Sequence, residues 1–284
     1  MFDTVHMSVP FELNHDDEIV LYNDEVLSYI RYKPEWNRLL INCSIPKVIY
    51  GNNVAEINEL DITKFWKIVE NRIEELFQKT VNKNDWQVYR LDLCKNFKLE
   101  NDRQLNLYIH QLAKIKLSRK DTFLRNNETV EYVNKSMKIH FYDKQKQLKH
   151  ARIKDDSLLE QAKDILRFEI QLKKDGLRSY SHKCKAVDLL TQDFYKQVMN
   201  EQLELINTKL DQLDVSEDLL SSELFSLGLT ISKIEKVFAF LTFIDEFGES
   251  FVRNTYGQNY YTRQTVLKEY NEKLKQKNSF KLAI

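Results

Sequence analysis

The sequence predicts an α+β fold, in which an antiparallel sheet is backed by helices and followed by an all-helical C-terminal domain. Two observations lead to this prediction. Up to about residue 185, apolar residues alternate between the short period of strands and the longer period of amphipathic helices. Beyond that point the strand patterns stop and helical patterns dominate. We therefore expect a domain at residues 1–185 and a helical domain at 186–284, which serves DNA or partner binding.

The first hundred residues mix strand and helix patterns. Strands are predicted at residues 4–9, 26–31 and 38–50. Asp61 is a suitable N-cap for a helix that ends near Val81. The residues that recur at helical spacing along it, and are expected in the core, are Ile62, Phe65, Trp66, Val69, Ile73, Leu76 and Phe77.

The rest of the first domain continues in the same way. A strand is predicted at residues 86–97, and an amphipathic helix follows that carries apolar residues from Leu105 to Ile115. Further strands are expected near residues 128–133, 137–144 and 165–172, which complete the sheet.

The C-terminal domain contains only helical patterns. Ser232 and Glu235 have the spacing of a capping box, and Gly248 stands where a C-cap glycine is expected. The helices are predicted at residues 187–211, 217–226, 232–247 and 259–277.

Composition is that of a soluble folded protein. Hydrophobic residues make up 42% and charged residues 30% of the chain. The longest nearly apolar stretch, residues 237–244, is far shorter than the ~20 residues that span a bilayer. We expect a cytoplasmic protein without a membrane segment. The three cysteines show no CxxC spacing, so neither a disulfide framework nor a thiolate zinc site is indicated.

Charge is distributed unevenly although the net charge is zero. Residues 83–185 hold 24 basic and 14 acidic side chains, a net charge of +10, whereas residues 1–82 and 186–284 carry −6 and −4. A concentrated positive field suits a polyanion such as DNA. A solvated lysine-rich surface explains the same distribution equally well.

Three predicted strands place reactive side chains opposite their apolar face. Because side chains alternate along a strand, these residues converge on one polar surface if the strands share a sheet. The residues opposite the apolar face are Arg90, Asp92, Asn96, His140, Tyr142, Lys144, Arg167, Glu169 and Gln171. Those expected to converge are Asp92, His140, Tyr142, Lys144, Arg167 and Glu169.

This surface suits phosphodiester chemistry. Asp92 and Glu169, with or without His140, can hold Mg²⁺ or Mn²⁺, which polarises a scissile phosphate. Tyr142 can then attack phosphorus, helped by Lys144 on the same predicted strand face, while Arg167 neutralises charge on the phosphate. Salt bridges and ordinary packing are the alternative interpretations of the same side chains.

At these residues the chain resembles the gene II/gene X replication proteins of filamentous phages and their relatives on Gram-positive plasmids and phages. The resemblance covers most of the chain. Its motifs, in family order, are MFDTV at 1–5, SIPKVIYGNN at 44–53, RLDLCKNF at 90–97, ETVEY at 128–132, KIHFYDK at 138–144 and LRFEIQL at 166–172.

The resemblance implies roles for individual residues. The tyrosine of the YxK element, the strand-cleaving nucleophile of the family, matches Tyr142, and its lysine matches Lys144. The RxD and RFE elements match Asp92, Arg167 and Glu169 as metal and phosphate ligands. Lys47 and Asn52, beside Gly51, are candidates for contact with single-stranded DNA, although a structural turn also explains Gly51 and Asn52. Arg90 and Lys138 are further DNA-binding candidates.

Two features depart from relatives. The glutamate that commonly follows in YxKxxE is replaced here by Gln147, which implies a weaker or differently built metal site. None of the six histidines forms the HxH pair of the broader tyrosine nucleases. A carboxylate-based site, with His140 as an optional ligand, is what these departures predict.

The expected function is therefore rolling-circle replication initiation. The protein would nick one strand of a plasmid or phage origin, keep the 5′ end on Tyr142 and leave a 3′-hydroxyl primer. A host helicase and DNA polymerase are the expected partners, and a homo-oligomer is allowed. Two alternatives remain open, a conjugative relaxase with the same chemistry and a catalytically degenerate origin-binding regulator.

Overall fold

The computed structural model describes residues 1–13, 19–212, 230–277 and 282. The chain divides into two compact units, one containing Met1–Leu210 and the other Asp211–Leu282. The first unit includes helix α7 (Ala186–Leu189) and all of helix α8 (Gln192–Asp211) except its last residue. This unit therefore extends past residue 185, the boundary expected from the sequence.

The described strands form one nine-stranded sheet, in the order β2-β3-β4-β1-β5-β9-β8-β7-β6. Every neighbouring pair is antiparallel, as predicted. The strands are β1 (Phe2–Pro10), β2 (Ile19–Asp24), β3 (Ser28–Lys33), β4 (Arg38–Ser44), β5 (Gln87–Lys98), β6 (Asp121–Arg125), β7 (Thr129–Val133), β8 (Met137–Asp143) and β9 (Ile165–Lys173).

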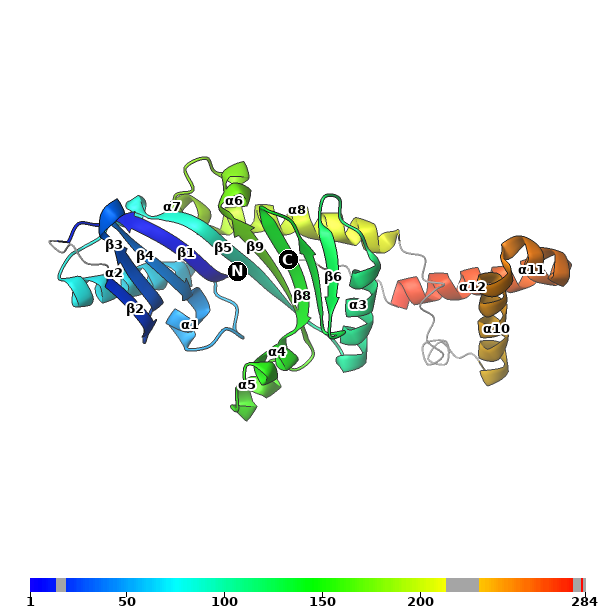
Figure 1. Cartoon of the computed structure of the whole chain (residues 1–284). Coiled ribbons are helices and arrows are strands. Elements are labelled where there is room, and N and C mark those ends of the chain that lie inside the picture. The colour runs from blue at the N-terminus through cyan, green and yellow to red at the C-terminus, as the bar shows by residue number, and fades with distance from the viewer. Residues whose placement is uncertain (14–18, 213–229, 278–281, 283–284) are drawn as a thin grey trace. The chain divides into compact units, whose positions relative to one another are not determined.

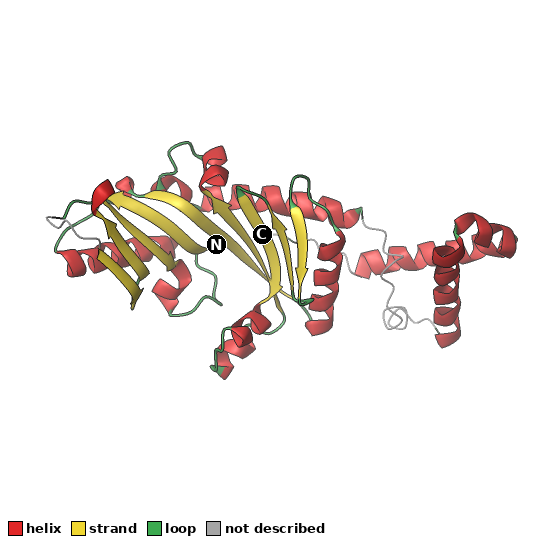
Figure 2. Cartoon of the chain, in the orientation of Figure 1, coloured by secondary structure: helices red, strands yellow, loops and turns green. Residues whose placement is uncertain are grey.

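Long helices lie along one side of this sheet (Figures 1 and 2). They are α2 (Glu59–Phe77), α3 (Asp102–Lys114) and α8. Tyr195 of α8 donates its hydroxyl hydrogen to the carbonyl of Cys94 on β5 at 3.1 Å, and its ring packs edge-on against Phe2. The apolar face of the central strands is fully buried, and the polar side chains are left on the opposite face.

Shorter helices connect these elements. They are η1 (Pro34–Trp36), α1 (Ile45–Tyr50), η2 (Lys83–Asp85), α4 (Lys144–His150), α5 (Asp156–Gln161) and α6 (Lys174–Tyr180). Figure 1 shows α4 and α5 together at the end of β8.

The structure corrects three predicted element bounds. The strand predicted at residues 38–50 ends at Ser44, and α1 begins at Ile45, with Pro46, which lacks a backbone N–H, in its first turn. Asn58, not Asp61, is the N-cap of α2, and Asp61 is its capping-box partner at N3. Lys144 does not lie on β8 but begins α4, for which Asp143 is the N-cap.

Two strands were not predicted. β2 lies at one edge of the sheet and β6 at the other. Most of β6 is exposed, so its sequence does not need the apolar alternation by which buried strands are recognised.

The second unit contains the helices α10 (Ile231–Phe247), α11 (Glu249–Tyr256) and α12 (Gln258–Lys277). Phe240, Val252 and Tyr260 form its small core. Gly248 ends α10 with a positive φ of 78°, which confirms the predicted C-cap. The N-cap is Thr230, so the box predicted at Ser232 does not start this helix. The helix predicted at residues 217–226 lies outside the described residues.

Within the described ranges, none of the helices combines the length and apolar character that crossing a membrane requires.

Candidate active site

The predicted convergence of polar side chains is found on the central strands β5, β9 and β8. His140 pairs with Glu169, and Tyr142 pairs with Arg167 across β8 and β9. Asp92 of β5 pairs with Gln171 of β9. Directly opposed residues share a face of the sheet, so these side chains lie on the one polar surface expected.

A cleft of about 370 Å³ opens on this surface. Strands β1, β5, β7, β8 and β9, the loop after α1 and helix α4 all contribute to it. The residues that line the cleft are Asp3, Thr4, Asn53, Arg90, Asp92, Glu128, Thr129, His140, Tyr142, Asp143, Lys146, Gln147, His150 and Glu169.

Tyr142 lies in the wall of this cleft with 8% of its surface exposed. Its hydroxyl donates to Oε2 of Glu169 at 3.0 Å, and Nε2 of His140 lies 3.2 Å from Oε1 of the same carboxylate. The three side chains therefore form a chain of contacts through Glu169.

The protonation states of this chain follow from its burial. Burial, and then the negative charge of Glu169, hold the pKa of Tyr142 well above its ordinary value of 10.0. Burial also acts to raise the pKa of Glu169, but its contacts with His140, Arg167 and Tyr142 outweigh burial and lower it. At neutral pH Tyr142 is a protonated donor and Glu169 an ionised acceptor.

Asp92 is bound by Arg90 on the same strand. The two guanidinium contacts measure 2.9 Å from Nε to Oδ1 and 2.5 Å from Nη2 to Oδ2. Burial raises the pKa of Asp92 to about 6, although the bond from Arg90 opposes this shift. Asp92 therefore lies in the cleft, but with its carboxylate already paired.

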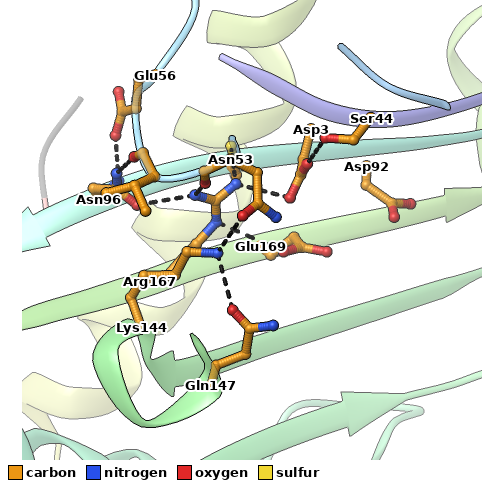
Figure 3. A network of polar contacts seen from close by, with 12 residues as sticks. Asp3, Ser44, Asn53, Glu56, Asp92, Asn96, Lys144, Gln147, Arg167 and Glu169 are labelled. Atoms are coloured by element: carbon orange, nitrogen blue, oxygen red, sulfur yellow. Dashed lines mark hydrogen bonds and ion pairs between the residues drawn. The ribbon is translucent and has the colours of Figure 1, made fainter. Parts of the chain in front are cut away.

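Arg167 lies beneath the cleft and is fully buried. Its Nη2 donates to Oδ2 of Asp3 at 2.8 Å and its Nη1 to the carbonyl of Asn53 at 2.7 Å, while Nε lies 3.8 Å from Glu169 (Figure 3). The guanidinium thus joins β9 to β1 and to the loop after α1. Arg167 is not among the residues that line the cleft, so it supports the site from below.

Lys144 is the second buried cation of the site. Its Nζ donates to Oδ1 of Asn53 at 3.1 Å and to Oε1 of Gln147 at 3.0 Å, as Figure 3 shows. Nζ lies 5.9 Å from the centre of the Tyr142 ring. Burial, and then the charge of Arg167, lower the pKa of Lys144 to about 8. Gln147 therefore has a defined role as an uncharged partner of this amine.

Of the four predicted DNA-binding residues, one lines the cleft and three lie outside its lining. Arg90 lines the cleft. Lys47 is exposed on α1, and Lys138 is bound to Glu131 at 2.5 Å. Asn52 turns inward, because its Oδ1 accepts from the backbone N–H of Val54 at 3.1 Å, as expected of the structural turn.

Several site residues were not identified from the sequence. Asp3 and Asn53 bind Arg167, and Glu128, Asp143 and Lys146 line the cleft near Tyr142. Asp3, Asn53 and Glu128 lie within the MFDTV, SIPKVIYGNN and ETVEY motifs. These motifs were the available signal, but strand-face periodicity does not apply to a loop or to the end of a strand.

The predicted metal ligands are of the chemical type that a hard cation prefers. Asp92 and Glu169 supply carboxylate oxygens in one cleft, and Nε2 of His140 is buried without a well-aligned hydrogen bond. Their present partners are Arg90 and Tyr142. Across the described residues, no three His, Cys, Asp or Glu side chains are grouped closely enough to hold a metal ion.

The family of the chain is shown by comparison with known proteins. The model of the Phage CRI family, which describes the N-terminal region of a phage replication-associated protein, matches residues 1–201. This range includes the whole sheet and every residue of the cleft. No curated protein and no solved structure matches the chain significantly. The match confirms the resemblance seen in the motifs, and the chain belongs to this family of replication-associated proteins, the filamentous-phage gene II type of replication initiator.

Proposed function

We propose that the protein initiates rolling-circle replication by nicking one strand of a plasmid or phage origin, with Tyr142 as the nucleophile. The family supports a role in replication initiation. One observation supports the chemistry most directly: Tyr142 lines a polar cleft and donates its hydroxyl hydrogen to the buried carboxylate of Glu169.

The proposed step is a transesterification at phosphorus. The Tyr142 oxygen forms a bond to the scissile phosphate, the bond from phosphorus to O3′ breaks, and the 5′ end stays on the protein as a phosphotyrosine. The phenolic proton, which Tyr142 donates to Glu169 in a hydrogen bond before the reaction, is released to solvent, and the departing O3′ takes a proton from solvent. The 3′-hydroxyl then primes synthesis by a host polymerase, with a helicase unwinding the duplex ahead.

The raised pKa of Tyr142 means that it must be activated when DNA binds. We include Mg²⁺ or Mn²⁺ in the proposal, with Asp92, Glu169 and His140 as the residues that would hold it. When bound, such an ion would supply positive charge for the scissile phosphate and the phenolate. Glu169 and His140 already touch, whereas Asp92 would have to exchange Arg90 for the ion.

Covalent capture tests this proposal. The purified full chain is incubated with a single-stranded origin oligonucleotide labelled on the 3′ side of the cleavage site, with Mn²⁺, with Mg²⁺ or with a chelator. We expect a labelled protein adduct that requires the metal and is lost in Tyr142→Phe. Tyr132→Phe is the matched control, because Tyr132 is buried in β7 and does not line the cleft. An adduct of equal yield in Tyr142→Phe would refute the assignment.

A second candidate function is an origin-binding regulator without nuclease activity. It is favoured by the 8% exposure of Tyr142 and by the pairing of Asp92 with Arg90. It predicts origin binding with no adduct under any divalent cation. A conjugative relaxase would form the same adduct, and only the genes beside this one distinguish it from a replication initiator.

A further inference from the structure

The cations that line the cleft are not Lys144 and Arg167, the pair to which the sequence assigned a catalytic role. Lys144 and Arg167 are fully buried and lie outside the cleft lining. Arg90 and Lys146 do line it. A phosphate that enters the cleft therefore meets this second set first.

Lys146 is the cleft cation whose charged end is held least firmly. Its Nζ lies 3.6 Å from Oδ2 of Asp143 and 3.8 Å from Oε1 of Glu128, both beyond ordinary hydrogen-bond length. Arg90, in contrast, makes contacts of 2.5 and 2.9 Å with Asp92. The Lys146 side chain is also 31% exposed, so a ligand can reach it.

The backbone of Lys146, in contrast, is fixed relative to Tyr142. Its N–H donates to Oδ1 of Asp143 at 3.0 Å, the N-cap bond of α4. Asp143 ends β8 directly after Tyr142, and its own N–H donates to the carbonyl of Glu128 at 3.3 Å. The Lys146 ammonium group, which makes only long contacts, is thus carried on a backbone that hydrogen bonds fix next to β8.

We infer that Lys146 binds a DNA phosphate in the cleft beside Tyr142, exchanging its contacts with Asp143 and Glu128 for the phosphate. This inference rests on the proposed function, since it assigns the DNA contact of the same cleft. A lysine ammonium offers three donors on a flexible stem, which suits a phosphate approaching from solvent. The two carboxylates hold it in place until DNA arrives.

Binding measured without cleavage tests Lys146 independently of the nicking chemistry. In the Tyr142→Phe background, the affinity of the full chain for single-stranded oligothymidylate is measured over a range of salt concentrations. Lys146→Gln should bind roughly tenfold more weakly, and the slope of log K against log salt should fall by ~0.7, the value for one lost phosphate contact on single strands. Lys146→Arg should keep the slope.

Lys149→Gln is the matched control. Lys149 lies on the same helix, is exposed, and binds Gln145 at 2.9 Å, but it does not line the cleft. The inference is overturned if Lys146→Gln and Lys149→Gln change the slope equally, or if Lys146→Arg is as impaired as Lys146→Gln. A slope lowered in Lys146→Gln but not in Lys149→Gln supports it, even if Tyr142 proves not to be the nucleophile.

Discussion

The polar face of the sheet carries two groups of buried side chains, an upper group that lines the cleft and a lower group that does not. Arg167 and Lys144 lie below the surface and are bound by Asp3, Asn53 and Gln147. Tyr142, His140, Asp92 and Glu169 reach the cleft. Both groups come from motifs of one family and from neighbouring positions in the sequence. The lower group fixes the loop and the strands, and the upper group meets whatever enters the cleft.

Glu169 is where the two groups join. Its Oε2 accepts from Tyr142 at 3.0 Å and lies 3.8 Å from Nε of Arg167. A change in the lower group should therefore act mainly on stability, and a change in the upper group mainly on chemistry or DNA binding. Substitutions in each group test this division.

The largest stability effect is expected for Arg167→Met. The substitution leaves the carboxylate of Asp3 buried, with the Ser44 hydroxyl at 2.9 Å as its remaining side-chain hydrogen bond among the described residues. Breaking a buried ion pair in this way costs ~3–5 kcal/mol of unfolding free energy. Urea denaturation of the two proteins measures the loss.

Arg90→Met is the matched change beside the upper group, because Arg90 lines the cleft and binds Asp92. Arg90 is 35% exposed, so we expect a smaller loss than for Arg167→Met, since water replaces part of its contact with Asp92. Equal losses from the two substitutions would contradict the division into a supporting and a cleft-lining group.

The next effect concerns Asp92 and pH. Its pKa is raised from 3.8 to about 6, so its protonated form stabilises the folded chain. This contribution to the free energy of unfolding is on the order of 2–3 kcal/mol. It is fully present below about pH 4 and is lost as the pH rises through 6. Asp92→Asn cannot titrate and should remove that part of the pH dependence. Urea midpoints of both proteins from pH 4 to 7 check it, and parallel curves would refute the raised pKa.

How far the sequence predicts this division depends on the kind of residue. Alternation along a strand tells which face a side chain takes, and His140, Tyr142, Asp92 and Glu169 lie on the shared face. Alternation carries no information on depth. Arg167 is covered by Asn53, a loop residue far away in sequence, so its burial is a tertiary property.

Element ends were the other limit of prediction. Lys144 matched the period of β8, but the Asp143 side chain caps a helix there and turns the chain. The strands β2 and β6 at the two edges of the sheet escaped prediction, whereas the buried central strands, with apolar residues at alternate positions, were found near their observed bounds.

A smaller effect is expected for Gln147→Glu. The pKa of Lys144 is lowered from 10.5 to about 8, so the uncharged amine favours the folded state. This contribution to the free energy of unfolding is fully present above pH 10.5 and is lost as the pH falls through 8. A carboxylate at position 147 would raise that pKa and stabilise the protein at pH 7 by ~1–2 kcal/mol. The difference between the variant and the unchanged protein should shrink from pH 8 to 10.

Gln145→Glu provides the control for this charge. Gln145 lies on the same helix and contacts Lys149 and the carbonyl of Leu159 rather than Lys144. If the two glutamate variants share one pH profile, the effect arises from net charge and not from the amine of Lys144.

The smallest effects separate two residues that the sequence grouped as DNA contacts. Asn52 holds its loop through Val54 N–H, so Asn52→Ala should cost ~1 kcal/mol in urea and leave the salt dependence of DNA binding unchanged. Lys47 is exposed on α1, so Lys47→Gln should leave stability unchanged and lower the salt slope by ~0.7 if it meets a phosphate. If Asn52→Ala lowers the slope of log K against log salt, the Asn52 side chain contacts DNA, contrary to this prediction. Because Asn53 follows directly and binds Arg167, any loss in Asn52→Ala should grow when Arg167 is also replaced, since the same loop then lacks both the Asn52 turn and the Arg167 contact and keeps the contact with Lys144.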